Sequence, residues 1–154
     1  MWKQRPRRRV LAVASGGGHW VQLMRLRAAF VGTEMHYATV DSSAAADVAP
    51  APLWTFVDSN QNTKLKLIMT TLKLTWIVLR VRPDVIVTTG AAPGYLALRV
   101  GGLLGARTMF IDSIANAQEL SMSARLSKGH ADRLLVQWPD VARETGADYS
   151  GAVI

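Results

Sequence analysis

Residues 15 to 20, Ser15-Gly16-Gly17-Gly18-His19-Trp20, combine three consecutive glycines with a histidine. The apolar run Val10 to Ala14 precedes them and predicts a buried parallel strand. Apolar residues at helical spacing follow them. Because glycine leaves backbone N–H groups uncovered and a helix N-terminus carries partial positive charge, this arrangement predicts an anion site. His19 would lie at its mouth, and histidine is the side chain that titrates near neutral pH.

A second glycine segment, Gly90-Ala91-Ala92-Pro93-Gly94, follows the β-branched run Val85 to Thr89, which predicts another buried strand. A plain tight turn is the alternative interpretation of this segment. The carboxyl ends of parallel strands meet at one edge of a sheet, so two such loops favour a shared phosphate or diphosphate site. The predicted phosphate-binding residues are Ser15, Gly16, Gly17, Gly18, Gly90, Ala91, Ala92, Pro93 and Gly94.

A third polar group follows the predicted strand Thr108 to Ile111, on the same ligand side of the sheet. It consists of Asp112, Ser113, Asn116 and Glu119. Its position favours contact with a ligand or with a domain junction. The alternative is structural, with Ser113 and Asn116 capping a helix and Glu119 in solvent.

Several other kinds of site are disfavoured because the sequence lacks the motifs or residue types that they require. The first loop is not Gly-x-Gly-x-x-Gly, and Asp41 is the only acidic candidate for a ribose contact, which disfavours a dinucleotide site. The Gly-Lys-Ser/Thr of a P-loop is absent, which disfavours an ATPase. The chain has no cysteine and three scattered histidines, so no metal site and no cofactor are predicted. A stand-alone nucleotide-binding Rossmann enzyme remains an alternative function.

Strand and helix patterns alternate along the chain, which predicts an α/β fold: a Rossmann-like parallel sheet with helices on both faces. We expect one domain over residues 10–154, preceded by a basic arm over residues 1–9. The predicted later elements are strands at Glu34 to Val40, Leu53 to Val57 and Leu134 to Gln137, and helices at Lys64 to Arg82, Tyr95 to Leu104 and Val141 to Thr145.

The formal net charge of +7 is concentrated at the N-terminus, where Lys3, Arg5, Arg7, Arg8 and Arg9 lie within nine residues. Such a cluster binds phosphate-bearing partners, either nucleic acid or an anionic membrane surface. No interleaving of aromatic and basic residues supports nucleic acid, so a basic nucleic-acid-binding module is kept only as an alternative. The apolar runs are too short for a signal peptide or a membrane span.

The predicted helix from Lys64 to Arg82 is apolar on two faces. We expect the face with Leu65, Ile68, Met69, Leu72, Trp76 and Leu79 to pack on the sheet. The opposite face lies beside a basic stripe, which favours contact with a bilayer over burial by other parts of the fold. The predicted membrane-contact residues are Arg7, Arg8, Arg9, Lys66, Lys73, Leu74, Ile77, Val78, Arg80 and Val81, with Leu67 on the same face.

An ordered set of short motifs resembles a known family, the membrane-anchoring subunits of split glycosyltransferases. These are the asparagine-linked-glycosylation fourteen family and its bacterial PssD-like polysaccharide relatives. The matching motifs are Ser15 to His19, Thr89 to Gly94, Asp112 to Asn116, Leu120-Ser121, Ala131-Asp132, Val136 to Pro139 and Tyr149 to Gly151. The eukaryotic members usually have Glu at the position of Asp112, so the Asp in this chain is closer to the bacterial form. The eukaryotic N-terminal membrane helix is missing, so peripheral anchoring is expected.

The resemblance implies the N-terminal, Rossmann-like half of a GT-B glycosyltransferase, and 154 residues agree with half of such an enzyme. The family's enzymes are inverting and metal-independent. This half would bind a polyprenyl-diphosphate-linked acceptor at the cytoplasmic face of the membrane. A separate small subunit would hold the UDP-sugar, for which glucuronic acid and N-acetylglucosamine are candidates. His19 takes the position of a proposed catalytic base, with a loop-orienting role as its alternative. Asp112, Ser113, Asn116 and Glu119 would lie on the acceptor side or at the junction.

Overall fold

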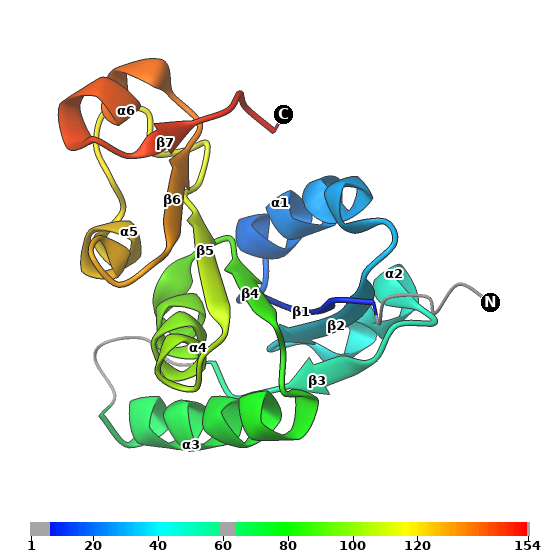
Figure 1. Cartoon of the computed structure of the whole chain (residues 1–154). Helices are drawn as coiled ribbons and strands as arrows, with labels where there is room; N and C mark the ends of the chain where they lie inside the picture. The colour runs from blue at the N-terminus through cyan, green and yellow to red at the C-terminus, as the bar shows by residue number, and fades with distance from the viewer. Residues whose placement is uncertain (1–6, 59–63, 154) are drawn as a thin grey trace.

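The computed structural model describes residues 7–58 and 64–153, and within them seven parallel strands form one sheet (Figure 1). Buried β-branched and small residues form the central strands, as in other parallel sheets covered on both faces. The strands are β1 (Arg9–Val13), β2 (Glu34–Thr39), β3 (Leu53–Thr55), β4 (Val85–Thr88), β5 (Arg107–Ile111), β6 (Arg133–Val136) and β7 (Asp148–Tyr149). The helices are α1 (Gly18–Leu26), η1 (Arg27–Phe30), η2 (Ser42–Ala44), α2 (Ala45–Val48), α3 (Lys64–Val81), α4 (Ala91–Leu103), α5 (Met122–Ser127) and α6 (Pro139–Thr145).

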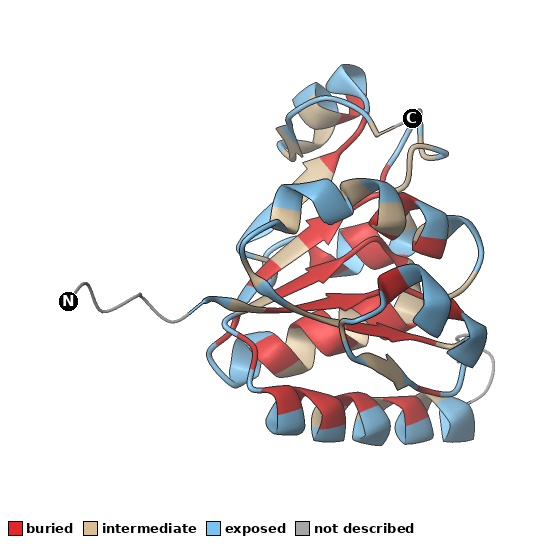
Figure 2. Cartoon of the chain, turned by 90° about the vertical axis from the view of Figure 1, so that its right-hand side faces the viewer, coloured by how far each residue is buried: buried red, intermediate tan, exposed pale blue. Residues whose placement is uncertain are grey.

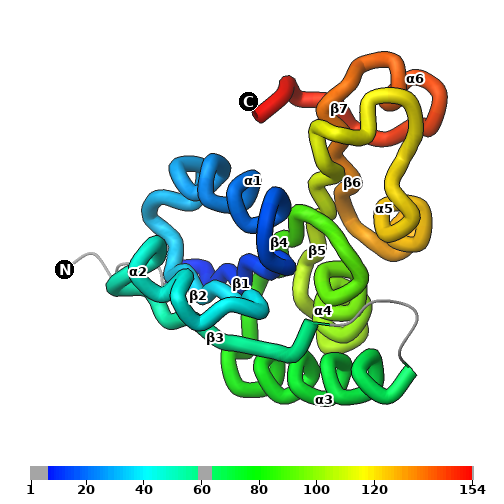
Figure 3. Tube along the Cα trace, turned by 180° about the vertical axis from the view of Figure 1, so that it is seen from behind, coloured from blue at the N-terminus to red at the C-terminus, as the bar shows by residue number. Residues whose placement is uncertain are grey.

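The order of the strands is β3-β2-β1-β4-β5-β6-β7. The chain moves outward from β1 to β3, returns across the sheet through α3, and continues outward again from β4. Figure 3 shows the two directions, with β2 and β3 at one end of the sheet and β6 and β7 at the other. The order therefore reverses between β1 and β4, where Val10 pairs with Val85. Ligands of open α/β sheets bind at such a switch point.

Helices cover both faces of this sheet (Figures 1 and 2). On one face, Leu11, Val13 and Ile86 pack against buried residues of α3 and α4. On the other face, Ala12 and Tyr37 pack against α1 and α2. The predicted α/β class with helices on both faces is confirmed.

Several boundaries differ from the sequence prediction. Helix α4 begins at Ala91 rather than Tyr95, so residues 91 to 94 form its first turn instead of a free loop. Arg9 is the first residue of β1 and not the end of an arm. Helix α5 and strand β7 were not predicted at all.

The predicted orientation of α3 is wrong, because the helix packs on the sheet through the apolar face opposite to the expected one. The face expected to meet a membrane is the buried one, and Leu74 and Ile77 are each 0% exposed. The apolar side chains of this stripe pack against core residues of β1, β4 and α4, and the hydroxyl of Thr70 donates to the carbonyl oxygen of Val57. The stripe consists of Thr70, Leu74, Ile77, Val78 and Val81.

The other apolar face of α3 points away from the sheet, and Figure 2 shows this side of the helix as exposed. Its residues are Leu65, Ile68, Met69, Leu72, Trp76 and Leu79, each at least 49% exposed; we call them the outer face of α3. Across the described residues, no helix combines the length and apolar character needed to cross a bilayer.

Candidate functional site

The two glycine segments meet at the switch point between β1 and β4. The first connects β1 to α1, and the second connects β4 to α4. Gly17 is the N-cap of α1 with a φ of 64°, a backbone conformation that favours glycine. Gly17 and Gly18 are exposed, so the start of α1 faces solvent at the carboxyl edge of the sheet. Free N–H groups at this helix start are suited to bind an anion.

His19 joins the two segments through a reciprocal pair of hydrogen bonds with Thr89. The His19 Nδ1 atom lies 2.9 Å from the carbonyl oxygen of Thr89, and the Thr89 hydroxyl donates to the carbonyl oxygen of His19 at 2.7 Å. A carbonyl oxygen only accepts, so Nδ1 must carry a proton. In the neutral ring the proton on Nδ1 leaves Nε2 with a lone pair, which makes Nε2 the atom that can accept a proton.

Gly90 is the residue that lets the His19 ring lie over the second segment. A Cβ atom at Gly90 would lie 2.8 Å from both Cε1 and Nδ1 of His19, closer than real Cβ atoms approach. The φ of Gly90 is 130°, and its N–H donates to the hydroxyl of Thr88. Sequence reasoning predicted glycine here for phosphate binding; the structure gives this glycine a role in seating His19.

Of the remaining residues of the second segment, two lie at the site and two are buried in the core. Ala91 has a positive φ of 63° and, like Ala92, is half-buried at the start of α4. Pro93 and Gly94 are buried, and a Cβ at Gly94 would collide with the Thr88 side chain. Gly94 therefore serves close packing of α4 on β4, and Pro93 has no N–H to donate. Because the Gly90 N–H is bonded to Thr88, the backbone N–H groups of Ala91 and Ala92 remain as candidates for the predicted phosphate contacts of this segment.

Asp112 organises the loop that follows β5. It is 2% exposed, and its Oδ1 accepts hydrogen bonds from the backbone N–H of Ser113 and the side-chain amide of Asn116. Its Oδ2 accepts from the backbone N–H of Ser121, the N-cap of α5. A carboxylate with these bonds holds residues 112 to 121 in place, which gives Asp112 a role in the architecture of this loop.

The other predicted members of this group make local contacts, but Ser113 and Asn116 do not cap a helix as the structural alternative expected. The Ser113 hydroxyl accepts from the backbone N–H of Ala115 at 3.2 Å, and the Asn116 amide is bound to Asp112. Glu119 is exposed and forms an ion pair with Arg125 at 2.8 Å. Of the four, Glu119 is the one whose carboxylate lies open to solvent and therefore to a partner.

Two glutamines that the sequence analysis missed connect this loop to its surroundings. The buried Gln22 of α1 and the buried Gln137, which follows β6, both donate to the carbonyl oxygen of Asp112, at 3.2 and 3.0 Å. The Oε1 atom of Gln137 accepts from the backbone N–H of Val153 at 2.7 Å. The helix that carries His19 is thereby bonded, through Asp112, to residues near the C-terminus. Gln22 belongs to no motif, and Gln137 lies in the motif Val136 to Pro139 without an assigned contact, so only the fold reveals this link.

Asp41, the candidate for a ribose contact, has a local structural role. Its Oδ1 accepts from the backbone N–H of Ser43 at 2.8 Å and caps η2. This hydrogen bond holds the pKa of Asp41 below its ordinary value. Within the described part of the chain, no three His, Asp or Glu side chains gather as a metal site.

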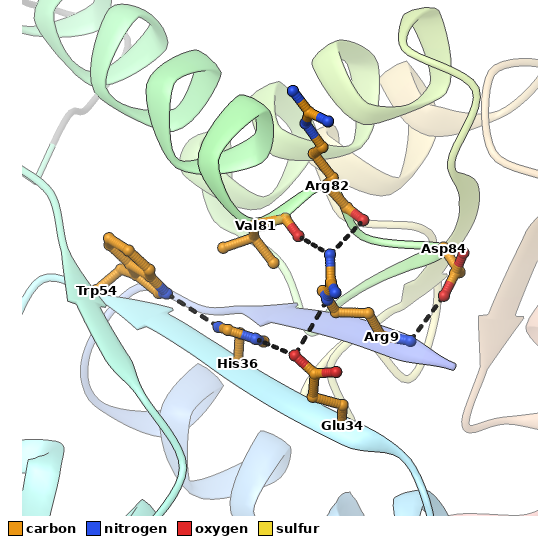
Figure 4. A network of polar contacts seen from close by, with 7 residues as sticks. All are labelled: Arg9, Glu34, His36, Trp54, Val81, Arg82 and Asp84. Carbon is orange, nitrogen blue, oxygen red and sulfur yellow. Dashed lines mark hydrogen bonds and ion pairs between the residues drawn. The ribbon is translucent and has the colours of Figure 1, made fainter. Parts of the chain in front are cut away.

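Arg9 was predicted to contact a membrane, but its side chain belongs to a network inside the fold (Figure 4). Its Nε donates to Glu34 at 3.1 Å, and its guanidinium donates to the carbonyl oxygen of Val81 at 2.7 Å, at the end of α3. Glu34 is also bound to His36, whose Nδ1 lies 3.4 Å from Trp54 Nε1. The hydrogen bond to His36, together with the charge of Arg9, lowers the pKa of Glu34 from its ordinary value of 4.5.

The remaining predicted basic residues are exposed. Arg7 and Arg8 line a cavity of about 660 Å³ together with Arg82 and Arg107, at the amino edge of the sheet. Lys66, Lys73 and Arg80 lie on the exposed part of α3. Lys66, Lys73 and Arg80 therefore lie on the same helix as the outer face of α3. Arg7 and Arg8 lie near Arg82, directly after the end of that helix.

Two solved structures share this fold over somewhat less than half of their own length. MurG from Acinetobacter baumannii matches with a TM-score of 0.71 at 14% identity, over 87% of this chain and 43% of that chain. The UDP-N-acetylglucosamine 2-epimerase from Rickettsia bellii matches with a TM-score of 0.70 at 12% identity, over 95% of this chain and 45% of that chain. The chain has the architecture of one Rossmann-like half of a GT-B protein.

Sequence comparison places the chain within this class. Residues 55–153 match the family described as oligosaccharide biosynthesis protein Alg14 like, and the chain belongs to that family. The UDP-N-acetylglucosamine transferase subunit ALG14 of Eremothecium gossypii is 37% identical over 79 residues, which are 47% of this chain and 35% of that protein. The human subunit of the same name is 25% identical over 162 residues, 84% of this chain and 75% of that protein. The chain thus spans about a third of the fungal relative.

Proposed function

We propose that this chain is the acceptor-binding, membrane-associated subunit of a two-subunit inverting glycosyltransferase. The observation that carries the proposal is that His19 connects the two glycine segments through its contacts with Thr89 and Gly90. Within the described residues, its Nε2 atom has no hydrogen-bond partner. The acceptor is a saccharide linked to a polyprenyl diphosphate, as used in cell-surface polysaccharide or oligosaccharide synthesis. Backbone N–H groups at the starts of α1 and α4 bind its diphosphate.

His19 acts as the general base in this proposal. Nε2 takes the proton of the acceptor hydroxyl while the hydroxyl oxygen bonds to the anomeric carbon of the donor sugar. The bond between that carbon and UDP breaks, and its electron pair leaves with UDP. Attack from the face opposite the leaving group inverts the anomeric centre, and no metal ion takes part.

A small partner subunit supplies the donor half. The matched solved structures contain about twice the span of this fold, and the sequence relatives are named as subunits. Their name makes UDP-N-acetylglucosamine the first donor to test. The partner approaches the carboxyl edge, where Glu119 and the loop held by Asp112 lie beside α1.

The chain associates peripherally with the cytoplasmic face of the cell membrane through the outer face of α3. Six exposed apolar side chains on one helix face, beside Lys66, Lys73 and Arg80, have the character of an interfacial helix. Arg7 and Arg8 add attraction to anionic lipid of about 1 kcal/mol for each basic residue near the surface.

Turnover by the complex with its partner tests the role of His19. His19→Ala is expected to lower turnover by about 100-fold or more, the usual contribution of a general base. His19→Gln keeps an amide in place of the ring but cannot take up the proton, so it should fail equally. His36→Gln and His130→Gln serve as controls and should retain turnover.

A different assignment of the base would give a different pattern. Full turnover by His19→Gln combined with loss of turnover in Glu119→Gln would identify the Glu119 carboxylate as the base and leave His19 only the role of joining the two glycine segments.

A further inference from the structure

A groove of about 600 Å³ lies between the carboxyl ends of β2 and β3 and the first half of α3. Its volume lies within the range of about 300–1,000 Å³ that is common for ligand pockets. The walls are mainly apolar and include Phe56, Met69 and Leu72, with Lys73 as the cationic residue. Such a lining suits a hydrocarbon with an anionic end.

The inner end of the groove adjoins the first glycine segment. Val40, which lines the groove, lies so close to Gly16 that a Cβ atom there would be 3.3 Å from Val40 Cγ2. The wall of the groove at Val40 is therefore in contact with the glycine segment that precedes the helix start assigned to phosphate binding. A ligand with a phosphate at that helix start would direct whatever it carries past Val40.

The outer side of the groove is continuous with the outer face of α3. Met69 and Leu72 belong to both, and they are 49% and 65% exposed. Lys73 lies beside them with its Nζ 4.5 Å from the centre of the Trp76 ring. An apolar path therefore runs from the exposed helix face, past a cation, to the glycine segment.

We propose that this groove holds the phosphate-proximal hydrocarbon units of the lipid acceptor. The proposal rests on the proposed function, because it takes the acceptor diphosphate to lie at the first glycine segment. It adds a subsite that recognises the lipid and not the sugar. The chain would then bind a lipid diphosphate more tightly than the diphosphate alone.

Calorimetric titration of the full chain with farnesyl diphosphate and with inorganic diphosphate tests this difference. Each buried methylene group raises affinity about fourfold. Farnesyl diphosphate should therefore bind at least about tenfold more tightly than inorganic diphosphate. Equal affinities would overturn the groove and leave the diphosphate site intact.

Two leucines on the outer face of α3 provide a matched pair of variants. Leu72 lines the groove, whereas Leu65 lies about two turns earlier, is 69% exposed, and does not line it. Leu72→Gln should lower affinity for farnesyl diphosphate about tenfold and leave inorganic diphosphate unchanged, and Leu65→Gln should change neither. Ser42→Phe, which narrows the groove from the opposite wall, should act like Leu72→Gln. Equal losses in the two leucine variants would overturn the proposal, because they would indicate general apolar binding.

Farnesol separates the groove from the proposed function. Binding of farnesol that depends on Leu72, without any binding of inorganic diphosphate, would support the groove and contradict the diphosphate site. Circular dichroism melts confirm that each variant is folded before titration.

Discussion

At the scale of single residues, Gly90 shows how closely the site is built. A Cβ at this position would meet the His19 ring at 2.8 Å, and the backbone φ of 130° is unfavourable for other residues. Gly90→Ala should displace the ring, lower turnover of the complex as strongly as His19→Ala, and destabilise the chain by roughly 1–3 kcal/mol. Kinetics and thermal melts measure the two effects.

Gly129→Ala is the matched control for this substitution. Gly129 also has a positive φ, of 83°, but a Cβ there would meet nothing within 4 Å. It should therefore reproduce the backbone strain without the loss of turnover. Loss of turnover in both variants would mean that backbone strain, and not contact with His19, is responsible.

Glu34 gives the fold a defined dependence on pH. Its pKa is lowered in the folded state, so its stabilisation is complete above its ordinary pKa of 4.5 and is lost as pH falls through the folded value. Glu34→Gln should lower the melting temperature at pH 7, and the difference from the unaltered chain should disappear as the pH falls below the lowered folded-state pKa of Glu34. Melts across pH 3–8, with exposed Glu144→Gln as control, measure this. A constant difference at every pH would exclude ionisation as the cause.

At the scale of elements, the two apolar faces of α3 can be tested separately, because one is buried in the core and the other is exposed. Leu74→Glu with Ile77→Glu places two charges at positions that are 0% exposed, so this variant should lose about 4 kcal/mol or more and not fold. Leu65→Glu with Leu72→Glu changes exposed positions, so this variant should fold but float poorly with anionic vesicles. Vesicle flotation and circular dichroism measure the two outcomes. Unchanged flotation of the second variant would exclude the outer face of α3 as the membrane contact.

The elements also show how far sequence reasoning reaches. The central strands β1 and β4 and the helices after them were predicted because apolar runs and glycine loops are local signals. The faces of α3 were exchanged because periodicity reveals two apolar stripes without showing which one fits the sheet. Helix α5 was missed because Met122–Ser127 is short, and the hydrogen bond from the backbone N–H of Ala124 to its N-cap Ser121 becomes evident only in the fold.

Part of the candidate site could also be predicted from the sequence. His19 and the first glycine segment were identified from their order along the chain. The bond between His19 and Thr89 joins residues 70 positions apart, and the buried Gln22 contacts Asp112 across 90 positions. Contacts over such distances depend on the strand order, which the local sequence pattern does not specify.

At the scale of the whole molecule, one Rossmann-like half should not complete the reaction by itself. The fold corresponds to 43% and 45% of the two matched enzymes. We expect the chain alone to have no transferase activity and no micromolar affinity for UDP-sugars, because the proposed function places the donor site on the partner. Titration of the purified chain with UDP-N-acetylglucosamine and UDP-glucuronic acid measures this. Micromolar binding without a partner would contradict the split enzyme and favour a stand-alone nucleotide-binding protein.

The direction of α3 has a consequence for how substrate would arrive. A helix that connects parallel strands runs roughly antiparallel to them, so the outer face of α3 lies alongside the strands and not across their ends. If that face rests on a bilayer, the carboxyl edge with its glycine segments opens sideways, level with the lipid headgroups. The acceptor could then enter by diffusing within the plane of the membrane, and the partner's search for this edge would become two-dimensional.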